Sequence, residues 1–576
     1  DFGYRDIKIA GRELLINDRP VFLRGTLECC IFPLQGYPPM EKDGWSTVFK
    51  TASNWGLNHL RFHSWCPPKA AFEVADSMGF YLQVELPLWS LNVGKTDSVN
   101  TFLEAEAQSI LQNYGNHPSF CLLSIGNELQ PDFNYLNTLV KSLKAQDRRH
   151  LYTASSFTFE KGHGGAPEEY DDFFVTQWTN NGWVRGQGVF DKEAPSFNKE
   201  YDSAMKDINI PLITHEIGQY AVYPNLKEID KYTGVLDPLN FKGIQLDLRE
   251  KGLESLADSF MLASGKLAYI LYKEEIERAL KTKGISGFQL LDLHDFPGQG
   301  TALVGLLDAF WDNKGIVEDS LFRQFCSPVV PLVHFDKATY WANEPMELLC
   351  DLKNYSNLDV STKDLRITIV GTDNELSLDS RSAKEDENGR IKFVIQAPNV
   401  AKASKFIMTA YVNGTDYKNS WDIWIYPQKE KVISESVLYT RTLKTAKEAL
   451  RRGETVLFNP EYDQIKGLEG KFVPVFWSPV HFPNQAGSMG ILCDPDHPAF
   501  EDFPTDYYSN WQWWSLLKQS RTVVMDSIKQ ITPIVRVIDN FSNNRRLGTL
   551  FEANVENGKL IFCSMDLVSD INSRPE

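Results

Sequence analysis

Two glutamates, Glu128 and Glu216, end apolar segments of the sequence. Glu128 follows SFCLLSIGN (residues 119–127), and Glu216 lies in PLITHEIG (residues 211–218). Two carboxyl groups about 5–5.5 Å apart, on either side of a glycosidic bond, can hydrolyse that bond with retention of configuration. One must be protonated and the other ionised, so their environments must separate their pKa values. The residues alone leave open which glutamate has which role, and also that both are solvated loop residues.

Other side chains at predicted strand ends could complete such a site. The substrate-binding candidates are Arg61, His63, Asn127, Trp178, His215 and Asp292. Arg61 would hold one carboxylate ionised, and Asn127 would hydrogen-bond a sugar hydroxyl. Trp178 could stack on a sugar or pack in the core, and strand alternation could turn His215 away from the site. For Glu85, a structural ion pair with a barrel arginine is favoured over a role in catalysis. No group of residues has metal-ligand spacing, so no metal is expected.

The elements that must position these residues form an alternating pattern over the first 328 residues. The eight apolar strand candidates are residues 20–26, 57–63, 80–87, 119–128, 150–156, 173–178, 211–218 and 285–293. Helical patterns lie between most of them, such as residues 43–56 and 69–79. This alternation predicts a (β/α)₈ TIM barrel over residues 21–328. Because reactive groups collect at the carboxyl ends of barrel strands, the fourth and seventh strands would bring Glu128 and Glu216 face to face.

Two further domains are expected after the barrel. Residues 329–427 alternate apolar and polar residues without a helical period, which predicts an immunoglobulin-like β-sandwich. Residues 428–576 begin with a β-α-β pattern and predict a flavodoxin-like or glutamine-amidotransferase-like α/β domain. Cys493 and His497 lack the strand–helix elbow of a nucleophile, so we expect no catalytic triad there. The tryptophans at 511, 513 and 514 are predicted to dock this domain on a neighbour rather than to bind glycan.

Composition narrows the classes of function. The chain has 576 residues and a net charge of -17, which argues against nucleic acid as a partner. No apolar run is long enough to predict a membrane span. The 14 tryptophans are compatible with binding to sugar rings, although most are expected to pack in the core. The eight cysteines are scattered and predict no disulfide framework. Homo-oligomerisation stays possible.

The sequence resembles glycoside hydrolase family 2 over about residues 1–328. DRPVFLRGT (residues 18–26) resembles the family's entry into the first barrel strand, and residues 56–87 resemble its second-to-third strand signature. SIGNE (residues 124–128) is similar to its acid/base motif, and THEIG (residues 214–218) to its nucleophile motif. The resemblance implies that Glu128 is the acid/base and Glu216 the nucleophile. It also implies that Arg61, His63 and Asn127 line the site.

The family resemblance also sets expectations about domains and substrate. Residues 1–20 resemble the seam that follows an immunoglobulin-like domain in this family, and the usual amino-terminal sugar-binding and immunoglobulin-like domains are not part of this chain. The expected function is that of an exo-acting retaining β-glycosidase of oligosaccharides or polysaccharides, first of all a β-galactosidase, without a cofactor. The alternatives are a β-glucuronidase or β-galacturonidase of the same family, and a non-catalytic glycan-binding or scaffold protein. By analogy, the protein is expected to be periplasmic or secreted.

Overall fold

The central element of the fold is an eight-stranded parallel sheet. The computed structural model describes residues 3–89, 92–298, 301–371, 375–428 and 436–576. The strands of this sheet are β4 (Leu23–Glu28), β5 (His59–Phe62), β6 (Tyr81–Glu85), β7 (Phe120–Ser124), β8 (Leu151–Thr153), β9 (Phe174–Thr176), β12 (Leu212–Gly218) and β13 (Ile285–Leu291). Their spatial order is β8-β7-β6-β5-β4-β13-β12-β9, so neighbours in the sheet are neighbours among the eight strands predicted from the sequence.

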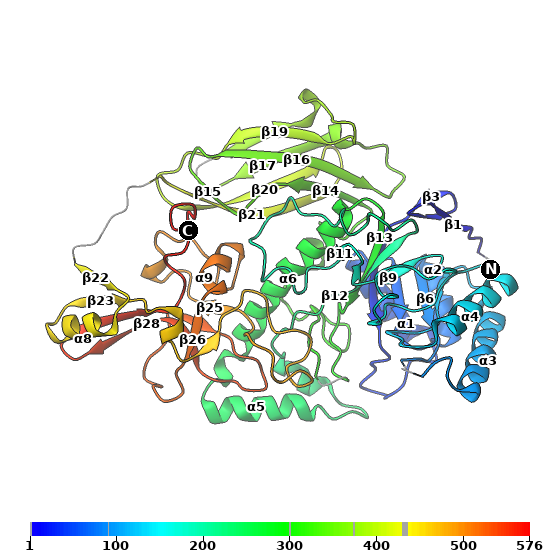
Figure 1. The fold of residues 1–576 in the computed structure, drawn as a ribbon, viewed down its shortest axis with the longest axis horizontal. Helices are drawn as coiled ribbons and strands as arrows, with labels where there is room; N and C mark the ends of the chain where they lie inside the picture. The colour runs from blue at the N-terminus through cyan, green and yellow to red at the C-terminus, as the bar shows by residue number, and fades with distance from the viewer. Residues whose placement is uncertain (1–2, 90–91, 299–300, 372–374, 429–435) are drawn as a thin grey trace.

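The sheet closes almost completely into a barrel. A parallel bridge between Ser156 and Val175 links its two ends, β8 and β9, just beyond the carboxyl end of β8. A backbone hydrogen bond of 2.8 Å from Asp172 N to Tyr152 O adds a second link. The predicted barrel and its strand order are therefore confirmed, and the weakest seam of the barrel lies between its fifth and sixth strands. Figure 1 shows this sheet in the right half of the molecule, where β6, β9, β12 and β13 are labelled.

The helical layer of the barrel is less regular than a (β/α)₈ pattern requires. Its helices are α1 (Lys42–Asn54), α2 (Lys69–Met78), α3 (Asp97–Tyr114), α4 (Phe133–Gln146), α5 (Leu239–Lys251), α6 (Ala257–Lys281) and α7 (Asp319–Phe322). The described stretch between β8 and β12 contains no helix; besides β9 it has turns and the small hairpin of β10 (Trp178–Thr179) and β11 (Gly182–Trp183). The expectation of eight repeated units is wrong there, because glycines and prolines interrupt any helical period in residues 162–195.

Residues 3–20 close the amino-terminal end of the barrel. They form an antiparallel sheet of β1 (Ile7–Ala10), β2 (Glu13–Ile16) and β3 (Arg19–Pro20). Leu14 and Ile16 on β2 are buried in a cluster with the barrel residues Leu23, Val175 and Ile213. This end of the barrel is therefore filled with apolar side chains, and any reactive groups must lie at the other end.

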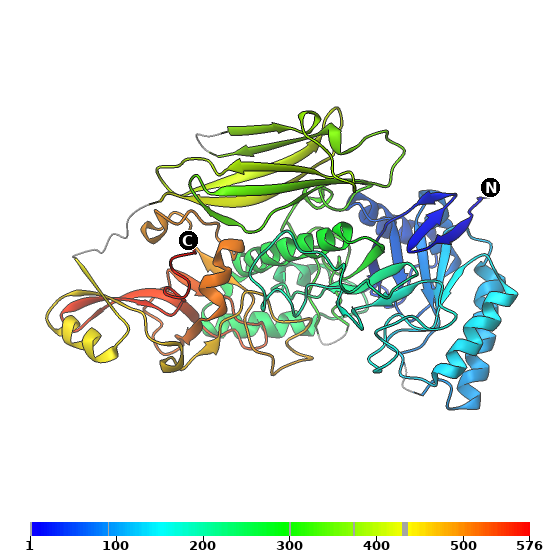
Figure 2. The same cartoon turned by 45° about the horizontal axis from the view of Figure 1, so that its top comes forward.

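A two-layered β-structure follows the barrel. One sheet has the order β14-β16-β19 and the other β15-β21-β20-β17-β18. Their strands are β14 (Val329–His334), β15 (Thr339–Trp341), β16 (Pro345–Asn354), β17 (Leu365–Val370), β18 (Glu375–Asp379), β19 (Ile391–Gln396), β20 (Ser404–Val412) and β21 (Lys418–Tyr426). Both sheets contribute to one apolar core that includes Leu348, Ile367, Met408 and Ile423. Figure 2 shows the two layers above the rest of the molecule.

The carboxyl-terminal region is built on a mixed sheet. Its strands are β22 (Val437–Thr440), β23 (Thr455–Phe458), β24 (Leu468–Glu469), β25 (Ile491–Cys493), β26 (Arg521–Val524), β27 (Val535–Val537), β28 (Leu547–Val555) and β29 (Gly558–Cys563). Pairing is parallel along β22-β23-β29 and antiparallel between β29, β28 and β26. The flavodoxin-like prediction needs a parallel sheet throughout. It is therefore wrong for the part of the sheet formed by β29, β28 and β26, where the pairing is antiparallel. The reason is local, because β28 and β29 are joined by a two-residue connection that permits only antiparallel pairing.

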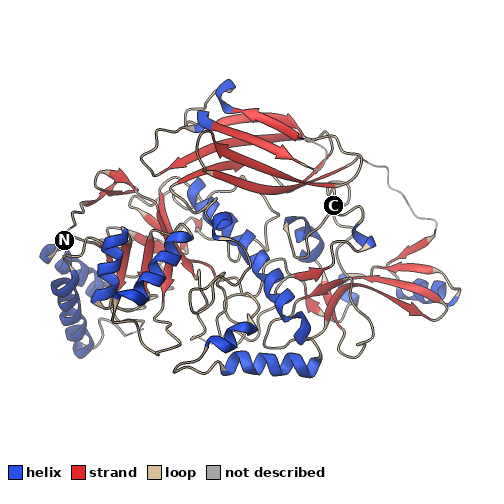
Figure 3. Cartoon of the chain, turned by 180° about the vertical axis from the view of Figure 1, so that it is seen from behind, coloured by secondary structure: helices blue, strands red, loops and turns tan. Residues whose placement is uncertain are grey.

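The barrel and the carboxyl-terminal region share one continuous apolar core, while the two-layered β-structure has a core of its own. Helix α6 is 25 residues long and extends from the barrel to β25, as Figure 3 shows from behind. Trp514 donates from its indole nitrogen to Phe190 O at 2.6 Å, and the ring of Trp511 packs edge-on against Phe197. Trp511 and Trp514 therefore dock on the barrel segment around residues 190–197, as predicted, whereas Trp513 packs within its own region, with its ring 5.0 Å from that of Phe503. Among the helices of the described residues, none is both long and apolar enough to cross a membrane.

Candidate active site

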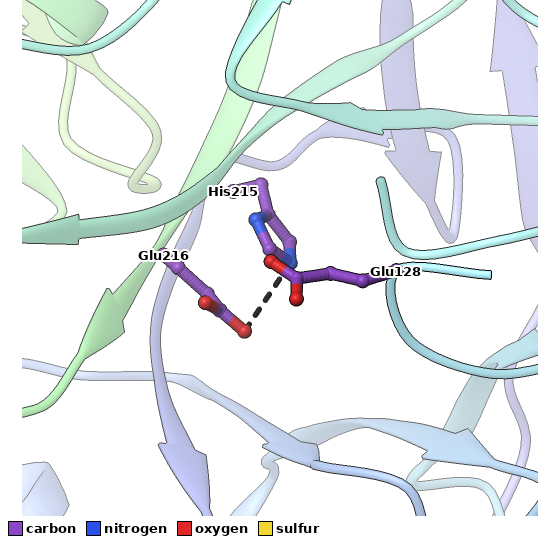
Figure 4. Close-up of side chains that lie close together, drawn as sticks. All are labelled: Glu128, His215 and Glu216. Carbon is purple, nitrogen blue, oxygen red and sulfur yellow. Dashed lines mark ion pairs between the residues drawn. The ribbon is translucent and has the colours of Figure 1, made fainter. Parts of the chain in front are cut away.

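Glu128 and Glu216 meet at the carboxyl-terminal end of the barrel. Glu128 lies just after β7, and Glu216 lies within β12. One ligating atom from each of Glu128, His215 and Glu216 lies within 4.8 Å of the other two. Figure 4 shows the two carboxyl groups approaching from opposite sides, with the ring of His215 beside both. The sequence-based expectation that the fourth and seventh strands bring these residues together agrees with this geometry.

An irregularity in β12 explains why adjacent residues both reach the site. Thr214 pairs with Phe288 and Ile217 with Leu290, so β12 advances three residues while β13 advances two. The extra residue is a β-bulge, which breaks the alternation of side chains. Glu216 has a φ of 47°, and Glu128 has a φ of 49°. Backbone conformations of this kind cost about 1–3 kcal/mol each and concentrate at functional sites. His215 therefore points into the site instead of away from it.

Arg61, on β5, is the cation that organises the carboxylates. Its side chain is fully buried, and its Nε donates to Glu85 Oε1 at 2.7 Å. Its Nη1 donates to Glu216 Oε1 at 3.3 Å, and its Nη2 donates to Asn127 Oδ1 at 2.5 Å. The predicted ion pair between Glu85 and a barrel arginine is confirmed. Since Glu85 also accepts the backbone N–H of Ser64 at 2.7 Å, its two oxygens are both committed to structural bonds.

Two neutral histidines hold Asn127 and the nucleophile candidate in place. Burial lowers the pKa of His215 to about 4, and burial followed by the charge of Arg61 lowers the pKa of His63. Gln177 Nε2 lies 3.2 Å from His215 Nδ1, which assigns the proton of this ring to Nε2. That N–H lies 3.1 Å from Asn127 Oδ1 and 3.3 Å from Glu216 Oε1. Asn127 Nδ2 in turn lies 3.0 Å from His63 Nε2, which accepts its hydrogen bond.

The two glutamates have opposite electrostatic environments. Burial raises the pKa of Glu128 to about 8, and the negative charge of Glu216 adds to this effect. Burial also acts to raise the pKa of Glu216, but His215 and Arg61 outweigh it and hold this pKa well below its usual range. At neutral pH, Glu128 is therefore mostly protonated and Glu216 is ionised. Environment alone thus gives the two carboxyl groups the different protonation states that a proton donor and a nucleophile need.

Trp89 is a site residue that the sequence did not single out. It lies in the segment after β6, and its indole side chain is hydrogen-bonded to Glu128 and lowers the pKa of that carboxyl. Its ring centroid lies 6.2 Å from that of His63, and 56% of the residue is exposed. A tryptophan two residues beyond the predicted third strand was the available signal, since strand ends of a barrel supply site residues.

The remaining predicted residues lie around the pair at different depths. Trp178 packs edge-on against Phe157 at 4.5 Å, and Phe157 lies 5.2 Å from the ring of His215. One aromatic ring, that of Phe157, thus separates Trp178 from His215, and Trp178 is half-buried. Asp292 is fully buried at the end of β13, where it accepts from Thr26 Oγ1 at 2.5 Å and lies 3.2 Å from His294 Nδ1.

The carboxylates and His215 are also the one group of described residues whose potential ligand atoms are close enough to hold a metal ion. Arg61 Nη1 lies only 3.3 Å from Glu216, and Glu128 holds a proton at neutral pH. Both features oppose a cation at this position. Asp295, near the end of β13, is occupied by a buried ion pair of 2.6 Å with Lys314. Cys493 in the carboxyl-terminal region is buried, and burial raises the pKa of its thiol to about 12.

Comparisons with known proteins match different parts of the chain. A family model described as "Domain of unknown function (DUF8487)" matches residues 438–576, and one described as "Domain of unknown function (DUF8488)" matches residues 344–427. No curated protein matches the chain.

Solved structures with similarity to the chain include three glycosidases. The β-glucuronidase of Parabacteroides merdae is 12% identical with a TM-score of 0.42, covering 76% of this chain and 52% of that protein. The β-D-mannosidase of Dictyoglomus thermophilum is 12% identical with a TM-score of 0.48, covering 76% and 55%. The GH2 β-galacturonidase of Eisenbergiella tayi, bound to galacturonate, is 15% identical with a TM-score of 0.40, covering 56% and 55%. The chain spans about half the length of these proteins.

Proposed function

We propose that the protein is a retaining β-glycosidase in which Glu216 is the nucleophile and Glu128 is the acid/base. The observation that carries this proposal is the pair itself. Its oxygens approach within 4.8 Å, the pKa of Glu128 is raised to about 8, and that of Glu216 is depressed. A separation of this size suits direct attack on carbon, whereas an inverting enzyme needs about 6.5–9.5 Å to fit a water molecule.

In the first step, the ionised Glu216 attacks the anomeric carbon and the bond from this carbon to the glycosidic oxygen breaks. Glu128 donates its proton to the departing oxygen, so the leaving group departs as a neutral alcohol. Arg61 and the N–H of His215 stabilise the carboxylate before the attack. A glycosyl ester on Glu216 and an ionised Glu128 result. Loss of the negative charge on Glu216 then lowers the pKa of Glu128, which suits its change of role.

In the second step, Glu128 accepts a proton from water while the water oxygen attacks the anomeric carbon. The ester bond to Glu216 breaks, the sugar leaves with its original configuration, and both glutamates return to their starting states. Asn127 is held by Arg61 on one side and by His63 on the other, so its amide is fixed where a sugar hydroxyl can bind. A fixed donor of this kind costs no reorganisation during the reaction.

The family resemblance of the sequence favours exo action on a non-reducing-end β-galactoside. The similar solved structures carry the names β-glucuronidase, β-mannosidase and β-galacturonidase, so the sugar is the variable to test. Nitrophenyl β-galactoside, β-glucoside, β-mannoside, β-glucuronide and β-galacturonide form a suitable panel. The wild type is compared on it with Glu216→Gln, Glu128→Gln and Glu193→Gln, the last changing an exposed carboxylate that is paired with Lys199.

We expect turnover of at least one β-glycoside by the wild type and by Glu193→Gln, and its loss in Glu216→Gln. A 2-deoxy-2-fluoro analogue of the substrate should form a stable ester on Glu216, identified by peptide mass spectrometry. Labelling of any other residue would refute the assignment of the nucleophile. If the wild type binds oligosaccharides but hydrolyses none of the panel, the alternative of a non-catalytic glycan-binding protein is favoured instead.

A further inference from the structure

Arg185 is a buried guanidinium without an acidic partner. It lies two residues beyond β11, in the helix-free stretch between β9 and β12, and it is 1% exposed. Its Nη2 donates to Gln219 Oε1 at 2.7 Å, and its Nε has no hydrogen-bond partner. Among the described residues, no carboxylate lies within ion-pair distance of it. The comparably buried Arg61 and Arg278, by contrast, each contact a glutamate at 2.7 Å.

Glu275, on α6, interacts electrostatically with Arg185, but both oxygens of this carboxylate already accept backbone hydrogen bonds. One of its oxygens accepts the backbone N–H of Gly186 and, at 3.2 Å, that of Gln187. The other accepts the N–H of Gly218 at 2.8 Å. Burial raises the pKa of Glu275, with Arg185 acting in the opposite direction. The charge of Arg185 is therefore balanced from a distance, and its Nε–H has no acceptor among the described residues.

Several contacts place Arg185 beside the catalytic pair. Its partner Gln219 lies three residues beyond Glu216, and the backbone N–H of Gln219 donates to Leu291 O at the end of β13. The charge of Arg185 contributes to lowering the pKa of Glu128 and of His215. A sugar held between the two glutamates would thus lie within the field of this guanidinium.

A buried cation with a single neutral partner is unfavourable unless an anion joins it. The guanidinium presents a planar set of donors that matches a carboxylate with two parallel hydrogen bonds. We propose that Arg185 binds the carboxylate of a uronic acid, so that the substrates of this site are β-uronides rather than neutral β-galactosides. This inference rests on the glycosidase function proposed above and names its substrate class.

Among the described residues, Arg24 is a second buried arginine without an acidic partner, but it lies elsewhere in the barrel. It is 7% exposed and also lacks a carboxylate, but its Nε donates to Gly56 O at 2.7 Å and its pKa is lowered by burial. It lies at the amino-terminal half of β4, away from the pair. The lack of an acid therefore becomes informative for Arg185 only in combination with its position beside Glu128 and Glu216.

The test measures two quantities on wild type, Arg185→Gln, Arg185→Lys and Lys192→Gln. Lys192→Gln is the matched control, because it removes one positive charge from an exposed side chain of the same segment. The first quantity is kcat/KM for nitrophenyl β-galacturonide, β-glucuronide and β-galactoside. The second is calorimetric binding of free galacturonate, glucuronate and galactose, which does not require turnover.

We expect the wild type and Lys192→Gln to prefer one of the uronides in both measurements. In Arg185→Gln, kcat/KM for the uronide should fall about 10²–10³-fold more than kcat/KM for the galactoside, as expected for a lost charge-assisted contact. Arg185→Lys should fall less, because it keeps the charge but not the planar fork. Circular dichroism of each variant checks that the loss is not one of folding.

Turnover of the galactoside but of neither uronide by the wild type would overturn this inference and leave the glycosidase function standing. Equal losses on galactoside and uronide in Arg185→Gln would likewise overturn it. If the wild type hydrolyses nothing but binds a uronate that Arg185→Gln does not bind, the anion site stands and the glycosidase function fails. Absence of both turnover and uronate binding would reject both.

Discussion

Replacing Glu216 with glutamine should lower the pKa of Glu128 by an amount that the geometry sets. The two carboxyl groups approach within 4.8 Å, and the pKa of Glu128 is about 8. At this distance and an effective dielectric constant of about 20, two unit charges interact by about 3.5 kcal/mol. This energy corresponds to about 2.5 in pKa. The variant Glu216→Gln should therefore bring the pKa of Glu128 to about 5.5, still above the ordinary value because burial is unchanged.

Carbon-13 NMR of protein labelled at the glutamate side-chain carboxyl carbon measures this pKa directly, without a substrate. The resonance of Glu128 is assigned by its absence from Glu128→Gln and from the double variant with Glu216→Gln. Glu193→Gln controls for the general effect of removing one negative charge. A Glu128 resonance that titrates near 4.5 in the wild type, or one whose pKa is unchanged by Glu216→Gln, would refute the claim that the two carboxyl groups are coupled.

Three further predictions concern the same network. Trp89→Phe removes a bond that lowers the pKa of Glu128, so the basic limb of the pH–rate profile should move up by about one pH unit; Trp183→Phe, at another exposed indole, should leave it in place. Arg61→Met should destabilise the protein by about 3–5 kcal/mol, because Glu85 loses its only cation, and Glu85→Gln in the same chain should recover part of the loss in thermal unfolding. Glu128→Gln should become more stable than the wild type as the pH rises from about 5 to about 8. Over that range the unfolded wild type has released the proton of Glu128, which the folded wild type still holds, so the wild type loses stability as the pH rises. Melting curves of both proteins at several pH values test the sign of this difference.

The barrel could be predicted because its strands are buried on both faces. Segments such as FCLLS in β7 are therefore apolar throughout, and every residue of that strand is buried. Glu128 and Glu216 end the fourth and seventh strands, and reactive side chains of a barrel lie at the carboxyl ends of its strands, so the sequence predicted that these two residues meet. The Arg61–Glu85 pair followed from the same placement, since a charge buried at a strand end is stabilised by an opposite charge beside it.

Other features depend on contacts that no local pattern encodes. The bulge that turns both His215 and Glu216 into the site is a mismatch between β12 and β13, and it exists only in the pairing of two strands. Arg185 follows a hairpin in a stretch without helical or strand period, so its position beside the pair depends on tertiary packing. The mixed sheet at the carboxyl end was missed because its first β-α-β unit is typical of a parallel fold.

The segment of residues 473–477, in the carboxyl-terminal region, packs against the barrel residues that follow Glu216. Trp477 N donates to Gln219 O at 2.8 Å, and Ala221 N donates to Val475 O at 3.1 Å. Tyr220 and Phe476 form an antiparallel bridge, so this distant segment lies against the chain that carries Glu216. The structure of the barrel next to Glu216 therefore depends on the carboxyl-terminal region. A truncation before residue 437, or a chimera with a different carboxyl-terminal region, would expose apolar surface and remove the backbone contacts of residues 219–221, which follow the proposed nucleophile Glu216. Substitutions at 473–477 should therefore change the geometry of the site as well as the stability of the fold.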